Sequence, residues 1–149
     1  MATSDSPLVY VVPLNRKSIS VSGMSTISLL ENHRRYFHPS EQPGYPSEPA
    51  DYLGFRYDGR LQSIHRVLNT QVVDDLREEL RDLTGDEFLR SVLGYGPYFL
   101  FRLGPTLGPD REIRSGPIWN TRSYVYLDLL LDCATIETAM EATKKRKDA

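Results

Sequence analysis

Hydrophobic and polar residues alternate most clearly in residues 52–67, YLGFRYDGRLQSIHRV. Two apolar, aromatic runs in this stretch flank the pair Asp58-Gly59. An Asp-Gly pair in that setting is the strongest short-range hairpin signal, because a type I′ turn needs a positive φ at both central residues. The pattern therefore predicts a β-hairpin with a two-residue turn, in which Tyr57 pairs with Arg60.

The two-residue turn predicts which side chains of the hairpin share a face. Counting outward, three further pairs lie opposite one another: Phe55 and Gln62, Leu53 and Ile64, and Tyr52 and His65. We expect the face with Leu53, Phe55 and Ile64 to be buried in the core. The other face then carries Tyr52, Gly54 and Arg56 across from His65, Ser63 and Leu61.

That second face is the first candidate site. Gly54 has no side chain and is expected to leave a gap between Tyr52 and Arg56. An aromatic ring, a guanidinium, an imidazole and a hydroxyl around a gap are suited to lining a ligand pocket. The alternative is the ordinary polar face of a half-exposed hairpin.

Shorter apolar runs predict three more strands, at residues 8–12, 98–103 and 123–131. The first ends at a proline and is expected at an edge or in a barrel. Residues 13–51 form a Pro- and Ser-rich loop region, with either a strand or a helix in 18–30 and a helical turn at 31–37.

Helical periodicity and capping residues predict the remaining elements. A stripe of apolar residues spaced three and four apart indicates an amphipathic helix over residues 72–83. A capping box at Thr84 predicts a second short helix at 86–93. Thr135 is expected to cap a C-terminal helix that runs through Lys147, and the end of this helix overlaps a basic tail at 144–149.

The order of these elements predicts the fold class. Helices are inserted between strands and do not alternate with them, which is typical of an α+β protein. At 149 residues we expect a single domain over residues 1–149. We expect a small, mostly antiparallel β-barrel or curved sheet with inserted short helices and a C-terminal helix.

Composition narrows the function classes. A net charge of -2 excludes a strongly basic nucleic-acid binder, and one cysteine excludes a disulfide framework and a cysteine-rich zinc site. The N-terminus lacks a signal-peptide pattern, and no apolar run approaches the roughly 20 residues that span a bilayer. We expect a cytoplasmic protein with no membrane partner.

Standard catalytic signatures are absent from the sequence. It contains no phosphate-binding loop that ends in Gly-Lys-Ser/Thr and no nucleophile elbow. His33 and His38 do not have zinc-helix spacing and are interpreted as surface loop histidines, and Cys133 as a buried structural thiol. We expect no metal, no cofactor and no catalytic residue. If the protein is an enzyme, His65 is the candidate base and Arg56 the group that stabilises an anion.

The loop at residues 104–119, punctuated by three Gly-Pro pairs, is the second candidate site. Together with the residues that follow it, the loop gathers five candidates for binding: Arg111, Arg114, Trp119, Asn120 and Arg122. Tryptophan stacks on a base, guanidinium groups bind phosphate, and an amide reads a base edge. The alternative is that the tryptophan packs into one end of the core and the arginines form ion pairs with nearby acidic residues.

The strand YLGFRYDG, its partner RLQSIHRV, the helical insertion, and the later strands YFLFRL and SYVYLDLLL resemble the PUA-like superfamily, which includes ASCH and EVE modules. The resemblance covers about residues 52–131. It implies a small β-barrel, and PUA-like domains in prokaryotes often bind RNA or read modified bases in DNA. It also implies that a base or nucleotide docks against a face lined by Arg56 and the loop that bears Trp119.

These observations predict a nucleic-acid- or nucleotide-binding module of PUA-like type, with RNA or DNA as the partner. The nine binding candidates are Tyr52, Arg56, Ser63, His65, Arg111, Arg114, Trp119, Asn120 and Arg122. One alternative is a protein-interaction or regulatory domain that uses its tyrosine-rich sheet. Another is a small hydrolase or nuclease that uses His65 and Arg56.

Overall fold

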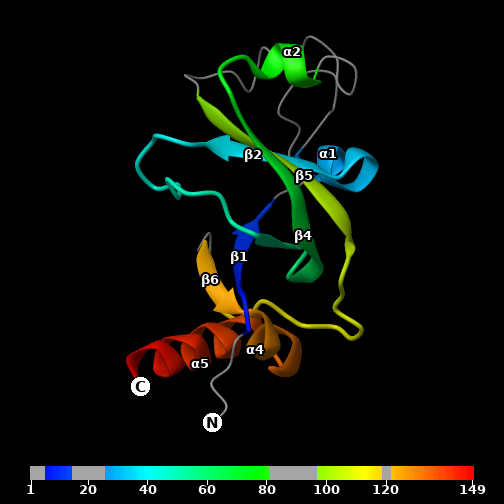
Figure 1. The fold of residues 1–149 in the computed structure, drawn as a ribbon. Coiled ribbons are helices and arrows are strands. Elements are labelled where there is room, and N and C mark those ends of the chain that lie inside the picture. Colours follow the sequence, from blue (N-terminus) through cyan, green and yellow to red (C-terminus); the bar gives the residue numbers. More distant parts are fainter. Residues whose placement is uncertain (1–5, 15–25, 81–96, 119–121) are drawn as a thin grey trace. The chain divides into compact units, whose positions relative to one another are not determined.

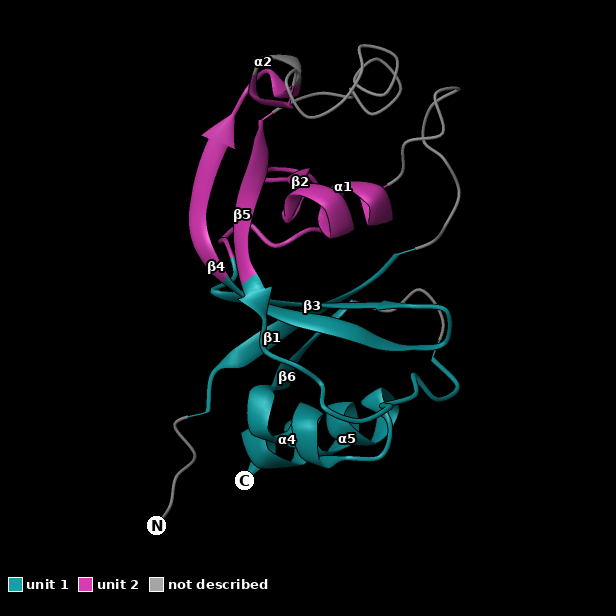
Figure 2. Cartoon of the chain, turned by 90° about the vertical axis from the view of Figure 1, so that its right-hand side faces the viewer, with its two compact units in different colours: residues 1–14, 50–66, 105–149 teal, residues 15–49, 67–104 magenta. Residues whose placement is uncertain are grey.

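The structure, a computed structural model, describes residues 6–14, 26–80, 97–118 and 122–149. Its strands form one mixed sheet in the order β2-β5-β4-β3-β1-β6 (Figure 1). The chain divides into two compact units (Figure 2): unit 1 holds residues 1–14, 50–66 and 105–149, and unit 2 holds 15–49 and 67–104. The prediction of an α+β fold with a C-terminal helix is confirmed. The sheet is not closed, so of the two predicted forms, a barrel or a curved sheet, the barrel is wrong.

Unit 1 is built on β1 (Leu8–Pro13), which lies between two other strands. It runs parallel to β3 (Tyr52–Tyr57) and antiparallel to β6 (Ser123–Tyr126). The prediction of an edge position for the first strand is therefore wrong. β3 also pairs antiparallel with the first part of β4 (Arg60–Val73).

The predicted turn at Asp58-Gly59 is confirmed. Asp58 has φ 56° and Gly59 has φ 79°, as a type I′ turn requires, and Tyr57 pairs with Arg60. Beyond Arg56, however, a β-bulge shifts the register by one residue, because Arg56 pairs with Leu61 whereas Phe55 pairs with Ser63. A one-residue shift moves every later side chain of β4 to the other face.

The shift moves His65 and Ser63 away from the face of Arg56. His65 pairs with Leu53, and its ring lies 5.9 Å from that of Phe55. Ile64 instead pairs with Gly54. The predicted face that combines Arg56 with Ser63 and His65 is therefore wrong.

The face with Gly54 packs in the core of unit 1, and Leu53 and Phe55 on the opposite face are fully buried as well, as predicted. A Cβ atom at Gly54 would lie 3.1 Å from Val9 Cγ1 and 3.6 Å from Leu61 Cδ1, so neighbouring side chains already fill the expected gap. The core cluster on this face joins the strands to α4 (Leu127–Asp132) and α5 (Ile136–Asp148). Its fully buried members include Val11, Ile64, Val125, Leu130 and Ile136.

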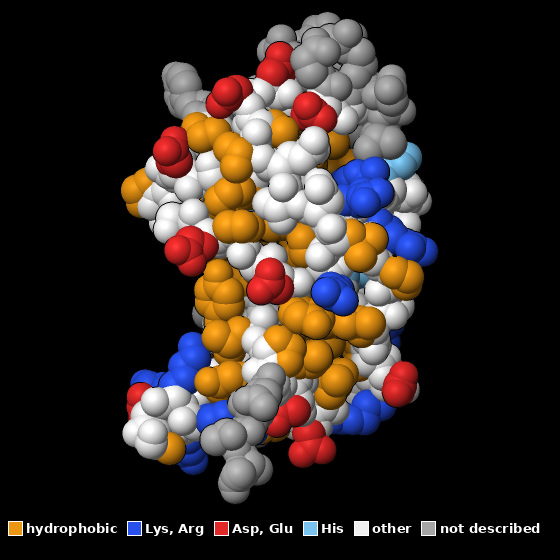
Figure 3. Space-filling model, viewed as in Figure 1, with side chains coloured by type: hydrophobic (Ala, Val, Ile, Leu, Met, Phe, Trp, Pro, Cys, Tyr) orange, Lys and Arg blue, Asp and Glu red, His pale blue; other side chains and the backbone are white. Residues whose placement is uncertain are grey.

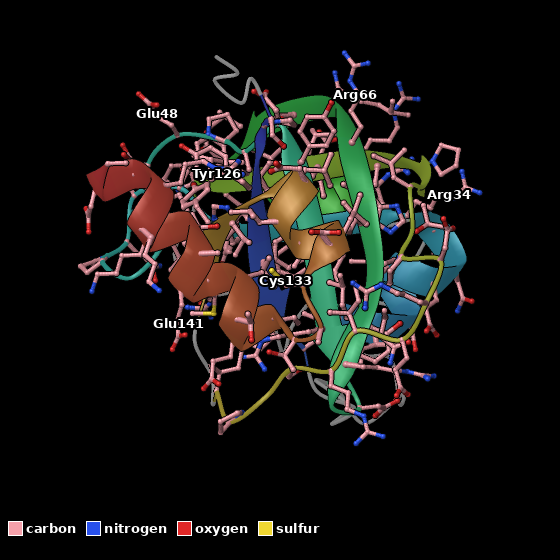
Figure 4. The ribbon with its side chains drawn as sticks, turned by 90° about the horizontal axis from the view of Figure 1, so that it is seen from below. Arg34, Glu48, Arg66, Tyr126, Cys133 and Glu141 are labelled. Atoms are coloured by element: carbon pink, nitrogen blue, oxygen red, sulfur yellow. The ribbon has the colours of Figure 1, made fainter. Side chains whose placement is uncertain are left out.

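The C-terminal part of unit 1 confirms one predicted element and corrects another. Thr135 caps α5 as expected, because its side chain accepts a hydrogen bond of 3.0 Å from the amide of Thr138. The predicted strand at 123–131 ends at Tyr126, and α4 begins at Leu127. Cys133, the predicted buried thiol, is half-buried at the junction of the two helices (Figure 4).

Unit 2 contains α1 (Thr26–His33), β2 (Arg35–Pro39), α2 (Leu76–Leu80) and most of β5 (Tyr98–Thr106). β2 pairs antiparallel with β5. The core of unit 2 contains Leu29, Val73, Leu76, Leu80, Tyr98 and Leu100. The predicted loop region at 13–51 therefore contains a helix and a strand.

Two further predictions in unit 2 need correction. The helix expected at 72–83 begins only at Leu76, because Val72 and Val73 belong to β4. His38 is no surface residue, since only 2% of it is exposed. The helix predicted at 86–93 lies outside the described residues.

Within the described part of the chain, no helix has the length and apolar character needed to cross a membrane.

Candidate functional site

The main candidate site is a hollow of about 280 Å³ in unit 1, called the Arg56 hollow below. Three segments form it: the end of β1, the β3–β4 turn and the loop between β5 and β6. Its lining residues are Pro13, Leu14, Arg56, Tyr57, Asp58, Gly59, Ser115, Gly116 and Ile118. The lining residues therefore combine one guanidinium, one carboxylate, one phenol and one aliphatic hydroxyl with several apolar side chains.

Backbone hydrogen bonds fix the three segments around the hollow. The amide of Leu14 donates to the carbonyl of Arg56 at 2.9 Å, and the amide of Ser115 donates to the carbonyl of Gly59 at 2.9 Å. The carbonyl of Ser115 in turn accepts from the amide of Glu137 in α5 at 3.1 Å. The β-turn, the end of β1 and the first turn of α5 thus hold the site in one arrangement.

Gly116 permits the close approach of the loop to α5. Its φ is 80°, a backbone conformation that residues with a side chain rarely adopt. A Cβ atom there would lie 3.0 Å from Glu137 Cβ. The Gly116-Pro117 pair was visible in the sequence as a turn signal. Its position beside the hollow was not.

Arg56 is the main charged group of the hollow, and only 8% of it is exposed. Burial lowers the pKa of its guanidinium from the ordinary value, because the charged form has lost part of its hydration. An arginine nevertheless stays protonated in proteins. The hollow therefore has a permanently charged guanidinium on its wall.

Ser115 supplies the second polar group. The residue is 6% exposed, and its Oγ has no hydrogen-bond partner among the described residues. A buried hydroxyl without a partner costs roughly 1–3 kcal/mol, so a ligand or a water that bonds to it is favoured. Ser115 was not among the residues predicted from the sequence.

The N-terminus of α5 is not part of an anion site, although it lies beside the hollow. The amides of Ile136 and Glu137 donate to the carbonyls of Arg114 and Ser115, and the amide of Thr138 donates to Thr135 Oγ1. These donors are already used within the protein. Arg56 is thus the lining residue that carries positive charge.

A second hollow of about 280 Å³ is lined by Arg60, Leu61, Gln62, Pro109, Asp110, Arg111 and Glu112. Arg60 bonds Glu112 at 3.4 Å, and Arg111 donates to the carbonyls of Leu131 and Cys133 at 2.9 and 2.7 Å. Arg111 therefore stabilises the C-terminal end of α4. Both arginines of this second hollow therefore bond to other groups of the protein.

The other predicted binding residues that the structure describes do not line the Arg56 hollow. Arg114 is exposed and pairs with Glu112 at 3.1 Å, as the ion-pair alternative expected. Ser63 and His65 bond to each other at 2.8 Å, and Tyr52 packs on the core of unit 1. Arg122 is exposed, and Trp119 and Asn120 lie outside the described residues. Of the candidates that the structure describes, only Arg56 lines the Arg56 hollow.

Comparison with known proteins found no family model, no curated protein and no solved structure that matches this chain.

Proposed function

We propose that the protein is a binding module for a phosphate-bearing ligand, a nucleotide or the terminal nucleotide of a nucleic acid. The observation that carries this proposal is the buried guanidinium of Arg56 on the wall of an open hollow, beside the buried hydroxyl of Ser115. Guanidinium groups bind phosphate with two parallel N–H donors, and these charge-assisted bonds are about twice as strong as neutral ones.

The carboxylate of Asp58 favours a nucleotide over a bare anion. A carboxylate in the hollow repels a lone phosphate but accepts hydrogen bonds from hydroxyl groups such as those of a ribose. Pro13, Leu14 and Ile118 add apolar surface for the sugar or base. The volume is close to the lower end of typical ligand pockets, roughly 300 Å³, which fits one nucleotide.

The resemblance to PUA-like domains supports the same ligand class, and it stays a prediction. The hydrolase alternative has less support, because the β-bulge places His65 on the opposite face of the hairpin from Arg56. A base that lies away from the anion-binding group has no role in the hollow.

Isothermal titration calorimetry tests the proposal with AMP, GMP, CMP and UMP, and with adenosine and inorganic phosphate as partial ligands. We expect at least one nucleotide to bind more tightly than adenosine or phosphate. Arg56→Gln should weaken binding roughly 50-fold, since a charged hydrogen bond contributes about 1.5–3 kcal/mol. Ser115→Ala should weaken it less, by roughly fivefold.

Arg114→Gln is the matched control, because Arg114 is an exposed arginine of unit 1 outside the hollow. It should leave binding unchanged. Labelled oligonucleotides at two salt concentrations then test for a longer nucleic acid, whose binding must weaken steeply with salt. If no nucleotide and no oligonucleotide binds at low salt, the proposal is wrong.

A further inference from the structure

The polar groups of the Arg56 hollow differ in their exposure to solvent. The guanidinium of Arg56 and the hydroxyl of Ser115 belong to residues that are 8% and 6% exposed. Asp58, which supplies the carboxylate among the lining residues, is exposed, as is its neighbour Gly59. Donors for an anion therefore belong to the buried part of the hollow, and an acceptor belongs to its solvent side.

The β3–β4 turn does not require an aspartate at position 58. Asp58 and Gly59 have φ 56° and 79°, and a type I′ turn accepts Asn-Gly or Gly-Gly at these positions as well as Asp-Gly. The side chain of Asp58 can therefore be changed to an amide, or removed, with the turn retained. This makes it possible to test the carboxylate as a binding group separately from the fold.

A carboxylate on the solvent side restricts the ligand groups that fit there. When ionised, it has two oxygens that accept hydrogen bonds and no donor, so it repels a second phosphate and binds hydroxyl groups. The 2′- and 3′-hydroxyls of a ribose are two neighbouring donors, and the sugar ring separates them from the 5′-phosphate. Acidic side chains bind a ribose hydroxyl in this way in dinucleotide-binding folds.

We propose, on the basis of the function proposed above, that the Arg56 hollow selects a ribonucleoside 5′-phosphate whose 2′- and 3′-hydroxyls are both free. Arg56 and Ser115 donate to the phosphate, and Asp58 accepts from the two hydroxyls. A deoxyribonucleotide lacks one of these hydroxyls, and an internal nucleotide of RNA has its 3′-oxygen in a phosphodiester. Two sources of the group remain: a free 5′-ribonucleotide and the 3′-terminal nucleotide of an RNA.

A second positive region of unit 1 does not supply this selectivity. The lysines at the end of α5, Lys144, Lys145 and Lys147, are exposed, and Figure 3 shows Lys and Arg side chains gathered there. None of these lysines lines either hollow. Exposed ammonium groups attract any polyanion and do not distinguish one sugar from another. Ligands that differ in the sugar must therefore be compared at equal charge.

Isothermal titration calorimetry with AMP, GMP, CMP and UMP, each beside its 2′-deoxy counterpart, tests the sugar preference. The two members of each pair have the same charge and the same base. For each base that binds, the ribonucleotide should bind roughly tenfold more tightly, because the deoxy ligand lacks one donor to the carboxylate. The 3′-deoxy form of the same ribonucleotide should be weakened to a similar extent.

Substitutions at Asp58 and Arg56 should affect different parts of the ligand. Asp58→Gly should bring each ribonucleotide to within about twofold of its deoxy counterpart, with the turn retained. Asp58→Asn should give an intermediate ratio, since the amide keeps one acceptor oxygen. Arg56→Gln should weaken both ligands by the same factor and leave their ratio unchanged.

Asp132→Asn is the matched control for the loss of a carboxylate. Asp132 is exposed at the end of α4 and lines neither hollow. Its substitution should change neither affinity. Circular dichroism should show the same fold for all variants.

Fluorescence anisotropy with a short 5′-labelled RNA identifies the source of the group. The RNA with free 2′- and 3′-hydroxyls at its end is compared with the same RNA ending in a 3′-phosphate and with the matching DNA. If an RNA end is the ligand, the first strand should bind more tightly than the mononucleotide. The other two should bind roughly tenfold less tightly than the first, although the 3′-phosphate adds negative charge. If a free nucleotide is the ligand, the mononucleotide should bind more tightly than any of the strands.

The outcomes separate this proposal from the proposed function. A deoxyribonucleotide that binds as tightly as its ribonucleotide, with both weakened by Arg56→Gln, would overturn the selection of the ribose hydroxyls and leave nucleotide binding in place. A tenfold ribonucleotide preference that persists in Asp58→Gly would overturn the role of Asp58. No binding of any nucleotide or RNA would overturn both proposals.

Discussion

The two units bury a basic side chain in different ways. Arg56 in unit 1 is 8% exposed and lines a hollow, whereas His38 in unit 2 is 2% exposed and lies among aromatic rings. The ring of His38 lies 5.3 to 6.0 Å, centre to centre, from the rings of Tyr36, Tyr45, Phe99 and Phe101. Both side chains are nearly buried, but of the two only Arg56 lines one of the two hollows described above.

The difference follows from the chemistry of the two groups. An imidazole can be neutral near pH 7 and can pack as an aromatic ring, whereas a guanidinium keeps its charge. Burial of a histidine is therefore compatible with a closed core, while burial of an arginine beside a hollow favours an anionic ligand. Burial marks a candidate binding site only when permanent charge and accessible space accompany it.

The largest effect on stability is expected at His38, which packs among aromatic rings in unit 2. His38→Ala should lower the free energy of unfolding by about 3 kcal/mol, because it removes a buried ring from an aromatic cluster. His38→Phe keeps a ring of similar volume and should cost less than about 1.5 kcal/mol. Urea unfolding followed by circular dichroism measures both. If the phenylalanine variant is as unstable as the alanine variant, the 2.7 Å contact of His38 Nδ1 with the carbonyl oxygen of Pro39 contributes more to stability than the packing of the ring.

A smaller effect is expected at the loop that borders the Arg56 hollow. Gly116→Ala should cost about 2 kcal/mol, since the new Cβ combines a positive φ with a contact to Glu137. Gly44 in unit 2 is the matched control: its φ is 89°, and a Cβ atom there would have no neighbour within 4 Å. Gly44→Ala should therefore cost only about 1 kcal/mol. Equal losses would show that the loop does not pack closely on α5.

The smallest effect is expected for a charge pair at the surface of unit 1. Hydrogen bonding to Arg146, at 2.9 and 3.0 Å, lowers the pKa of Asp128 from the ordinary value. A depressed folded-state pKa adds stability above the unfolded-state pKa of about 4, and this stability is lost as the pH falls through the folded-state pKa.

The side chain of Asp128 is 48% exposed, so solvent screening should keep the contribution below about 1 kcal/mol. Urea unfolding at pH 7 and pH 3 measures it. The wild type should lose slightly more stability at low pH than Asp128→Asn. A difference above about 2 kcal/mol would show that an exposed pair matters as much as a buried group.

The sequence predicted the parts of the fold that depend on local signals. The turn at Asp58-Gly59 needs two residues with positive φ, and Thr135 needs only its own side chain to cap α5, so both were predicted correctly. Residues 123–131 alternate like a strand, but the run Leu127 to Leu131 is equally compatible with a short helix. Tertiary packing, with Leu130 fully buried in the core of unit 1, decides between the two.

The candidate site depended on signals that the sequence does not carry. The β-bulge adds one residue to β4 without a glycine to mark it, and it moves Ser63 and His65 to the other face. Arg56 was predicted as a binding residue, and its pairing with Leu61 was predicted correctly because it lies between the turn and the bulge. Ser115 reaches the same hollow from more than fifty residues away through backbone bonds to Gly59 and Glu137, which no local pattern reveals.

The most direct test of the nucleotide proposal is an NMR titration of the ¹⁵N-labelled chain with the tightest-binding nucleotide. The side-chain Nε–Hε signal of Arg56 and the amide signals of Gly59 and Gly116 should shift together, with one dissociation constant. In Arg56→Gln the two glycine signals should stay in place at the same nucleotide concentrations. A nucleotide that shifts other signals but leaves these three unchanged would contradict the assignment of the Arg56 hollow as the binding site.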